Sequence, residues 1–138
     1  MATNHPGFGV MIGMLGGNAD TVKAHQSAMN KIIATATVAN DTLTLTFLDG
    51  SILKAVDSGQ SCCEHRYMVC DDDLAAYAGS VFTGMEIRDA PNEPDDYGEH
   101  EVQFLYVNTS NGPFHVASHN EHNGYYGGFW ITLNYEPA

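Results

Sequence analysis

Hydrophobic and polar residues alternate along much of the chain, and such alternation is typical of β-strands that bury one face. The clearest case is TLTLTF at residues 42–47, in which leucine and phenylalanine share one face and threonine occupies the other. Turn residues at Asn40–Asp41 and Asp49–Gly50 bound this segment, and the segments ATATV and SILKAV flank it. The pattern predicts a three-stranded antiparallel meander that begins near residue 33.

The segment before the meander has a helical period instead. Asn18 is a suitable N-cap, and Asp20 would lie in the first turn, where a negative charge favours the helix dipole. We therefore predict a helix over residues 19–31. The residues that recur at helical spacing through this segment are Val22, His25, Met29, Ile32 and Ile33.

The second half of the chain predicts more strands and one short helix. The Asn111–Gly112 pair is the strongest hairpin signal, and Asp71–Asp73 is suited to cap the short helix LAAYAG. Strands are expected at residues 61–70, 81–89, 101–109, 113–118 and 129–135, with polar loops at 90–98 and 119–128. The predicted fold class is α+β, an antiparallel β-sheet of about six or more strands with one or two helices packed on it.

The length of 138 residues fits one domain, which we place at residues 18–138. Residues 1–17 are rich in glycine yet apolar, so we expect this arm to pack on the domain or on another subunit of a homo-oligomer. No basic residue precedes the apolar stretch, which is too short to span a bilayer. We therefore expect a cytoplasmic protein that does not bind a membrane.

The charge balance excludes several partners. Seventeen acidic residues face five basic ones, which gives a formal net charge of −12. Such a surface cannot replace the counterions of duplex nucleic acid or of an anionic membrane. Arg66 and Arg88 are the only arginines, and each is either paired with a local carboxylate or available to an anionic ligand such as a phosphate.

The cysteines do not form a disulfide framework, because there are only three of them, Cys62, Cys63 and Cys70, and they are clustered. A nucleophilic cysteine with His65 as its base is one interpretation of this cluster. Side chains two positions apart on a strand rarely meet at hydrogen-bond distance, so a buried structural cysteine is the favoured interpretation.

Histidines suggest a metal site as an alternative, because His115, His119 and His122 fall in or beside one predicted loop. No recognised metal-ligand spacing supports that site, and a hydrogen-bonded or solvated histidine is the favoured interpretation. Nucleotide-binding glycine motifs and hydrolase nucleophile motifs are also absent from the sequence. We therefore expect no cofactor.

The segment HNEHNGYYGGFW at residues 119–130 has the most unusual composition. Its aromatic side chains are suited to sandwich a flat ring, and its glycines allow a close approach of the backbone. The alternative is a tight turn whose tyrosines cover the core. We take Asn123, Tyr125, Tyr126 and Phe129 as candidate ligand-binding residues.

The chain from about residue 33 to residue 135 resembles a family of short, mostly uncharacterised phage and bacterial domains. The matching segments are TLTLTFLDGS at 42–51, SCCE at 61–64, DDDLAAYAG at 71–79, Glu86, and NGYY at 123–126. Small phage proteins of this kind are candidates for anti-defence proteins. The chain is similar in size to one class of these, the anti-Thoeris sponges, which sequester cyclic nucleotide signals without cleaving them. The resemblance implies a non-enzymatic binding protein.

The expected function is therefore sequestration of a nucleotide-like immune signal, with stacking near residues 125–129 and the phosphates at Arg66 or Arg88. A first alternative is an acidic mimic of nucleic acid that inhibits a basic host protein. A second is a metal-dependent enzyme that uses His115, His119 and His122. The expected ligand-binding residues are Arg66, Arg88, Asn123, Tyr125, Tyr126 and Phe129.

Overall fold

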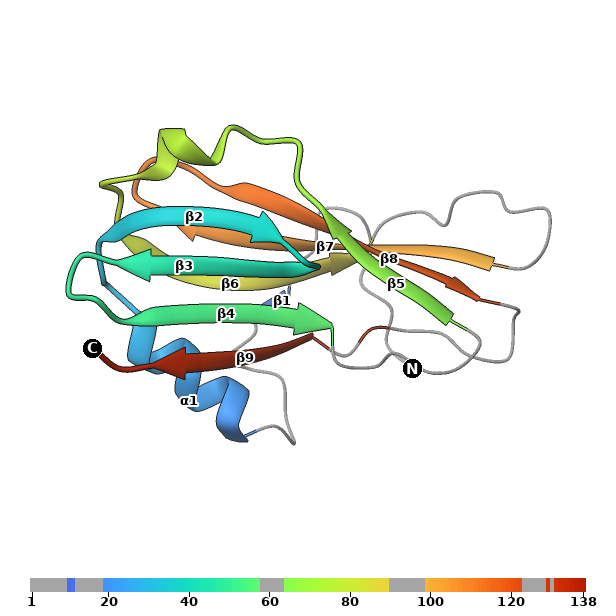
Figure 1. Cartoon of the computed structure of the whole chain (residues 1–138), viewed down its shortest axis with the longest axis horizontal. Coiled ribbons are helices and arrows are strands. Elements are labelled where there is room, and N and C mark those ends of the chain that lie inside the picture. Colours follow the sequence, from blue (N-terminus) through green and yellow to red (C-terminus); the bar gives the residue numbers. More distant parts are fainter. Residues whose placement is uncertain (1–9, 12–18, 58–63, 90–98, 123–128, 130) are drawn as a thin grey trace.

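The computed structural model describes residues 10–11, 19–57, 64–89, 99–122, 129 and 131–138. This part of the chain confirms the predicted α+β class, because it is rich in antiparallel strands and contains one α-helix (Figure 1). The arm at residues 1–17, where all but two residues lie outside the described part, stays a prediction. The helices and strands of the described part of the chain are β1 (Val10–Met11), α1 (Ala19–Ala28), β2 (Ile33–Ala39), β3 (Thr42–Phe47), β4 (Ile52–Asp57), β5 (Glu64–Val69), the 3₁₀ helix η2 (Leu74–Tyr77), β6 (Phe82–Asp89), β7 (Glu99–Thr109), β8 (Phe114–His122) and β9 (Ile131–Glu136).

The strands form two sheets rather than the single sheet expected from the sequence. One sheet has the order β1-β6-β7-β8-β5 and the other the order β2-β3-β4-β9, with antiparallel pairing throughout. In Figure 1 the four-stranded sheet lies in front of β6, β7 and β8. Each sheet carries one apolar face, and packing the two faces together removes both from water.

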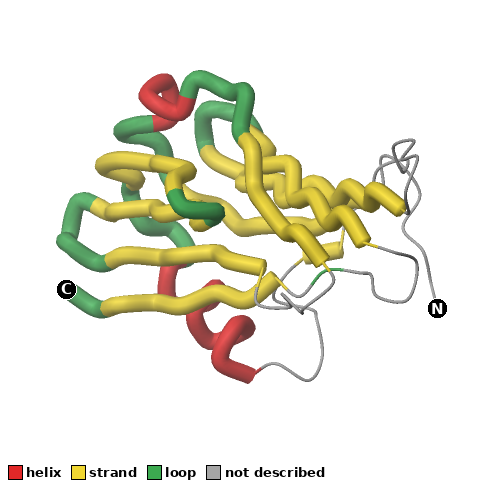
Figure 2. The backbone as a smooth tube through the Cα atoms, turned by 45° about the vertical axis from the view of Figure 1, so that its right-hand side comes forward, coloured by secondary structure: helices red, strands yellow, loops and turns green. Residues whose placement is uncertain are grey.

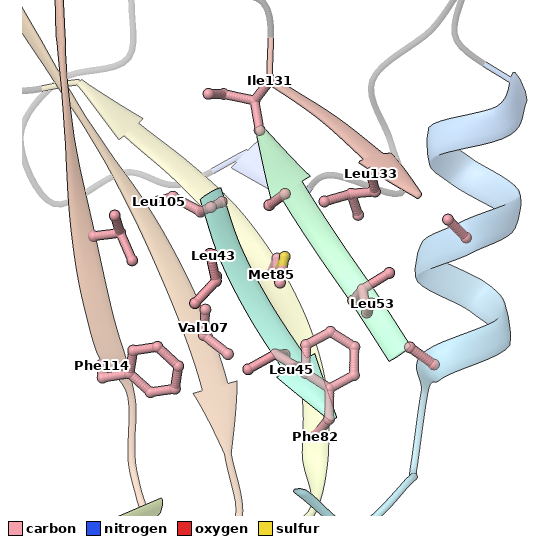
Figure 3. Close-up of a cluster of buried hydrophobic side chains, with 14 of the residues drawn as sticks. Leu43, Leu45, Leu53, Phe82, Met85, Leu105, Val107, Phe114, Ile131 and Leu133 are labelled. Carbon is pink, nitrogen blue, oxygen red and sulfur yellow. The ribbon is translucent and has the colours of Figure 1, made fainter. Parts of the chain in front are cut away.

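The predicted meander is confirmed, including the face that it buries. Leu43, Leu45 and Phe47 are at most 1% exposed, while the threonines between them are only partly buried. Figure 3 shows these leucines directed toward side chains of the opposite sheet, among them Val107 and Phe114. The core therefore lies between the two sheets.

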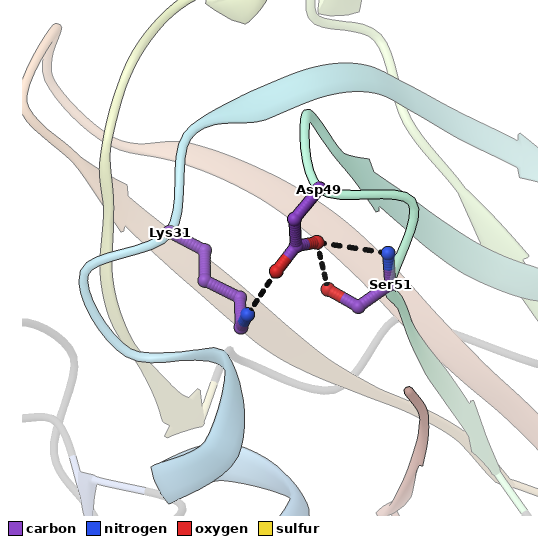
Figure 4. A network of polar contacts seen from close by, with 3 residues as sticks. All are labelled: Lys31, Asp49 and Ser51. Atoms are coloured by element: carbon purple, nitrogen blue, oxygen red, sulfur yellow. Dashed lines mark hydrogen bonds and ion pairs between the residues drawn. The ribbon is translucent and has the colours of Figure 1, made fainter. Parts of the chain in front are cut away.

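The turn between β3 and β4 is held by Asp49, as Figure 4 shows. One carboxylate oxygen accepts hydrogen bonds from the backbone N–H of Ser51 at 2.8 Å and from its hydroxyl at 2.5 Å. The other oxygen pairs with the ammonium group of Lys31. These contacts, the Lys31 hydrogen bond first among them, lower the pKa of Asp49, so this turn keeps its charge well into the acid range.

Helix α1 ends at Ala28, three residues earlier than predicted, and Asn30 then adopts a left-handed conformation with φ 67°. Two of its polar side chains bind backbone groups of strands, one in each sheet. Thr21 Oγ1 accepts from the N–H of Leu133 on β9 at 3.1 Å, and His25 Nε2 accepts from the N–H of Met85 on β6 at 3.0 Å. The helix thus connects the two sheets along one margin, as Figure 2 shows.

The backbone of β6 beside this contact has a conformation that favours glycine. Gly84 has φ 135°, and a side-chain Cβ at this position would lie 3.5 Å from Nε2 of His25. The pairing of β6 with β7 is irregular between Phe82 and Gly84, which is typical of a β-bulge. The bulge brings the N–H of Met85 to the helix.

The opposite margin carries η2, which confirms the predicted short helix and its cap. The carboxylate of Asp73 accepts from the N–H of Ala75 at 3.2 Å, although the helix is a single 3₁₀ turn. The hairpin at Asn111–Gly112 is also confirmed. Strand β8, however, continues to His122, so residues 119–122 are not part of a loop as predicted. No helix among the described residues is long and apolar enough to cross a membrane.

Candidate functional site

The two faces of the five-stranded sheet differ in chemistry. The cross-strand register places Leu105, Val116 and Ile87 side by side on the inner face, where each is at most 7% exposed. Residues of the opposite parity on the same strands point to the outer face. There the register aligns Tyr67 of β5 with His119 of β8.

One end of the outer face carries a hydrogen-bonded group of rings. The rings of Tyr67 and His119 are stacked, with centroids 4.7 Å apart and planes 4° apart. The Tyr67 hydroxyl donates to Oε2 of Glu121 at 2.6 Å and lies 3.4 Å from Nε2 of His100. That same His100 nitrogen lies 2.8 Å from Nδ1 of His119. Four titratable groups from three neighbouring strands are therefore connected by hydrogen bonds.

A second group of rings lies further along the same face. Tyr106 of β7 and His115 of β8 have centroids 5.3 Å apart and planes 23° apart, and the edge of Phe104 meets His115 at 5.1 Å. The Arg88 guanidinium lies 4.2 Å from the centre of the Tyr106 ring. Asp72 fixes the position of His115 by accepting its backbone N–H at 2.9 Å. The rings are thus held in defined orientations.

We call six of the rings on this face the ring surface: Tyr67, His100, Phe104, Tyr106, His115 and His119. The exposed ring of His65 also lies on this face, with its centroid 4.9 Å from that of Tyr67. The six rings of the ring surface are partly exposed, and between the two groups lies Ala117, whose methyl group projects less far from the sheet than the rings on either side. Such a surface offers partly exposed aromatic rings to a planar molecule and ring nitrogens to hydrogen-bond donors or acceptors.

Arg88 is a cation on this face. Its Nη2 pairs with Oε1 of Glu86 at 2.5 Å, and its side chain is 30% exposed. Its Nε is buried and, among the described residues, has no hydrogen-bond partner. A buried Nε is not accessible to a ligand, so an anionic group would have to be met by the terminal Nη donors of the partly exposed side chain.

Arg66 lies on the opposite, inner face of the sheet. Its Nη1 donates to both carboxylate oxygens of Asp57, at 2.8 and 2.9 Å, and the two side chains are 7% and 6% exposed. The register aligns Arg66 with the fully buried Asn120. This ion pair joins β5 to β4, so it connects the two sheets. Arg66 and Arg88 cannot contact the same small ligand, because the sheet separates them.

Two histidines of the alternative metal site, His115 and His119, do not converge. His115 and His119 point to the same face of β8 but are four residues apart, about 13 Å along a strand. The backbone of His122 pairs with Glu64 and Glu99. In the part of the chain that the structure describes, no group of three or more His, Cys, Asp or Glu residues is placed to hold a metal ion.

Three of the predicted ligand-binding residues, Asn123, Tyr125 and Tyr126, lie outside the described residues, so their role stays a prediction. Phe129 is partly buried and packs against the core. Among the cysteines, Cys70 donates its thiol to the backbone carbonyl of His115 at 3.4 Å, and burial raises its pKa. A protonated, hydrogen-bonded thiol fits the structural interpretation. Cys62 and Cys63 are not described.

Sequence reasoning missed four members of the ring surface, Tyr67, His100, Phe104 and Tyr106. A signal was present, because His100, Phe104 and Tyr106 share one parity on the predicted strand at residues 101–109 and its extension. The aromatic residues of that strand were not assigned to a face.

Two open grooves flank α1 and β9 on the other side of the domain. The larger has a volume of about 610 Å³, and its charged lining residues are Asp20, Lys54 and Glu136. Lys54 pairs with Glu136 at 3.1 Å. The groove thus carries a net negative charge and no aromatic side chain, so it is less suited to an anionic planar ligand than the ring surface.

The fold and this surface define a class: a two-sheet α+β domain that presents ordered rings on the outer face of one sheet. The chain belongs to a family described as a domain of unknown function, DUF7448, whose model matches residues 26–131. The whole ring surface lies within the matched residues. No curated protein and no solved structure matches the chain.

Proposed function

We propose that the protein is a non-enzymatic binding protein that sequesters a small, planar, nucleotide-like ligand on the ring surface. The observation that carries the proposal is the stacked arrangement of Tyr106 and His115 beside the guanidinium of Arg88. A base would stack on the exposed rings, and a phosphate would accept from Arg88. Stacking of one base on an aromatic side chain contributes about 1–3 kcal/mol.

The charges support a small ligand over a polymer. A net charge of −12 repels a long polyanion, whereas a single phosphate group responds mainly to its nearest neighbours. Arg88 is the better of the two arginines for this role, because Arg66 is buried in its pair with Asp57. The proposal therefore assigns the phosphate to Arg88 and a structural role to Arg66.

The biological setting that we propose is anti-defence. The resemblance to small phage proteins supports a phage-encoded protein that acts in the host cytoplasm and removes a cyclic nucleotide-like signal by binding it. The family itself carries no described function.

Isothermal titration calorimetry with a panel of linear and cyclic nucleotides tests the proposal. We expect one or more members to bind, and Arg88→Ala and Tyr106→Ala each to weaken binding at least tenfold. The matched control is Lys54→Ala, which removes a cation from the outer face of the other sheet and should leave the affinity within twofold. Absence of binding across the panel, or equal binding by all variants, would contradict the proposal.

The hydrogen-bonded group of Tyr67, His100, His119 and Glu121 favours a second candidate, an enzyme that uses acid–base chemistry without a metal. Connected titratable groups of this kind can transfer a proton to or from a bound molecule. The two candidates differ in the fate of the ligand. A bound nucleotide that is recovered unchanged by chromatography and mass spectrometry supports sequestration, whereas a product that disappears with His100→Ala supports the enzyme.

The acidic mimic receives less support. It depends on the carboxylates at residues 71–73 and on those of the loop at residues 93–101. Two of the first three are used within the domain, Asp72 by His115 and Asp73 by Ala75, and residues 93–98 lie outside the described part of the chain. A mimic needs carboxylates directed toward a partner.

A further inference from the structure

The two groups of rings on the ring surface are separated along the strands. His115 belongs to one group and His119 to the other, and four residues on the same face of β8 span about 13 Å. Side chains on a strand stand roughly perpendicular to the sheet, so the two groups of rings are a similar distance apart. A single base is shorter than this span, so it can stack within one group only.

The row of side chains between the two groups is lowest near its centre. The cross-strand register places Arg88 of β6, Phe104 of β7, Ala117 of β8 and Val69 of β5 in this row. Ala117 is the smallest of the four, whereas Phe104 and the 41% exposed Val69 project on either side of it. Side-chain bulk is therefore least at Ala117, on the line that joins the two groups.

A cation lies beside this line. Arg88 starts from the same row as Ala117, and its guanidinium lies 4.2 Å from the centre of the Tyr106 ring. Its side chain is 30% exposed, and one terminal nitrogen pairs with Glu86. The guanidinium carries further terminal donors, which can bind an anionic group placed between the two ring groups.

We propose that the ligand is a dinucleotide, two nucleosides joined through phosphate, with one base at each ring group and the linker across Ala117 beside Arg88. This inference rests on the proposed function and names its ligand class. Aromatic side chains stack with bases of any identity, so the spacing of the groups selects two bases in one molecule rather than a particular base. A phosphodiester and a pyrophosphate linker share the anionic group that Arg88 can bind.

Calorimetry with three adenine ligands tests the inference: adenosine monophosphate, a diadenylate joined by one phosphodiester, and diadenosine pyrophosphate. All three carry the same base, so they differ in the number of bases and in the linker. At least one dinucleotide should bind with one molecule per chain and at least tenfold more tightly than the monophosphate, because its second base contacts the second ring group. The tighter of the two dinucleotides identifies the linker.

Two variants report on the ring groups separately. Tyr67→Ala removes a ring from one group and Tyr106→Ala removes a ring from the other. If one ligand spans both groups, each variant should bind the tighter dinucleotide about tenfold or more weakly than the wild-type protein.

A third variant tests the path of the linker. Ala117→Leu adds bulk between the ring groups, so it should weaken binding of the dinucleotide at least tenfold and leave the monophosphate within twofold. The matched control is Ala39→Leu, the same change on the exposed outer face of the other sheet, which should leave all three affinities within twofold. Thermal unfolding shows whether each variant retains the fold.

The outcomes separate this inference from the proposed function. Dinucleotides that bind no more tightly than the monophosphate overturn the inference, and so does wild-type affinity in either tyrosine variant, because one ring group then holds the whole ligand. Ala117→Leu that weakens the monophosphate and the dinucleotide equally also overturns it. In these three cases a nucleotide still binds, so the proposed function stands, whereas it fails if no nucleotide of the wider panel binds.

Discussion

His25 on α1 accepts a hydrogen bond from the backbone N–H of Met85 on β6, at 3.0 Å, through its Nε2 atom. The imidazole is 4% exposed, and its edge packs against the ring of Phe82, 5.8 Å away between centroids. Only the neutral imidazole can accept this bond, since a protonated ring has no acceptor nitrogen. Burial accordingly lowers the pKa of His25 below its ordinary value of 6.5.

The first prediction concerns the pH dependence that His25 confers. Above pH 6.5 the histidine is neutral in the folded and unfolded states, so its contribution to stability is complete. As the pH falls below 6.5, the unfolded state binds a proton first, and the free energy of unfolding decreases until the pH reaches the lowered folded-state pKa. Urea unfolding at several pH values between 8 and 5 measures this decrease.

The control for this prediction is His25→Gln, whose amide oxygen can still accept from Met85. Because glutamine does not titrate, the variant should lose the part of the pH dependence that His25 contributes, while the other histidines contribute as before. Equal slopes of stability against pH for the two proteins would show that His25 is not the group responsible.

A second prediction concerns the contact of the same helix with β9, an edge strand of the other sheet. Thr21→Val keeps the shape of the side chain but leaves the buried N–H of Leu133 without its acceptor. We expect a loss of about 1–3 kcal/mol in the free energy of unfolding. Thr21→Ser retains the hydroxyl and should lose less, so the difference between the two variants in urea titrations isolates the hydrogen bond. If valine is no worse than serine, the hydroxyl does not hold β9.

A third prediction concerns the ion pair between the sheets. Asp57→Asn and Arg66→Met each leave one buried charge without its partner, and each should cost about 3–5 kcal/mol of stability. The double variant removes both charges. Its loss in the free energy of unfolding should therefore be smaller than the sum of the losses of the two single variants. Additive losses in this double-mutant cycle would indicate that the two residues act independently.

The sequence predicted the local elements well and their assembly poorly. The meander around β3 was predictable because leucine and threonine alternate there and turn residues bound each strand. The division into two sheets depends on the pairing of β4 with β9 and of β5 with β8, which are far apart in the sequence. The hydrophobic period within one strand does not indicate which distant strand it pairs with.

The ring surface was hard to predict for a related reason. On β7 both parities carry large apolar side chains, with Leu105 and Val107 on one face and Phe104 and Tyr106 on the other. Alternation therefore shows which residues share a face but not which face is buried. The pair of Arg66 and Asp57 was equally hidden, because the two residues belong to different sheets.

A last prediction separates stacking from hydrogen bonding on the ring surface. Tyr67 does both, since its ring stacks on His119 and its hydroxyl donates to Glu121. Tyr67→Phe removes only the hydroxyl. If a planar ligand is held by stacking, this variant should bind it within about twofold of the wild-type affinity, whereas Tyr67→Ala should bind about tenfold or more weakly, because one stacked base is worth about 1–3 kcal/mol.

Calorimetry with the tightest nucleotide of the panel measures both affinities, and thermal unfolding of the two variants controls for damage to the fold. The side chain is partly exposed on an outer face, so neither change should unfold the domain. Equal losses for phenylalanine and alanine would mean that the hydroxyl and its partners, rather than the ring, bind the ligand. That result would favour the acid–base enzyme over sequestration by stacking. Both variants lose the Tyr67 hydroxyl, so the loss would show that binding depends on its hydrogen-bonded group with Glu121, His100 and His119.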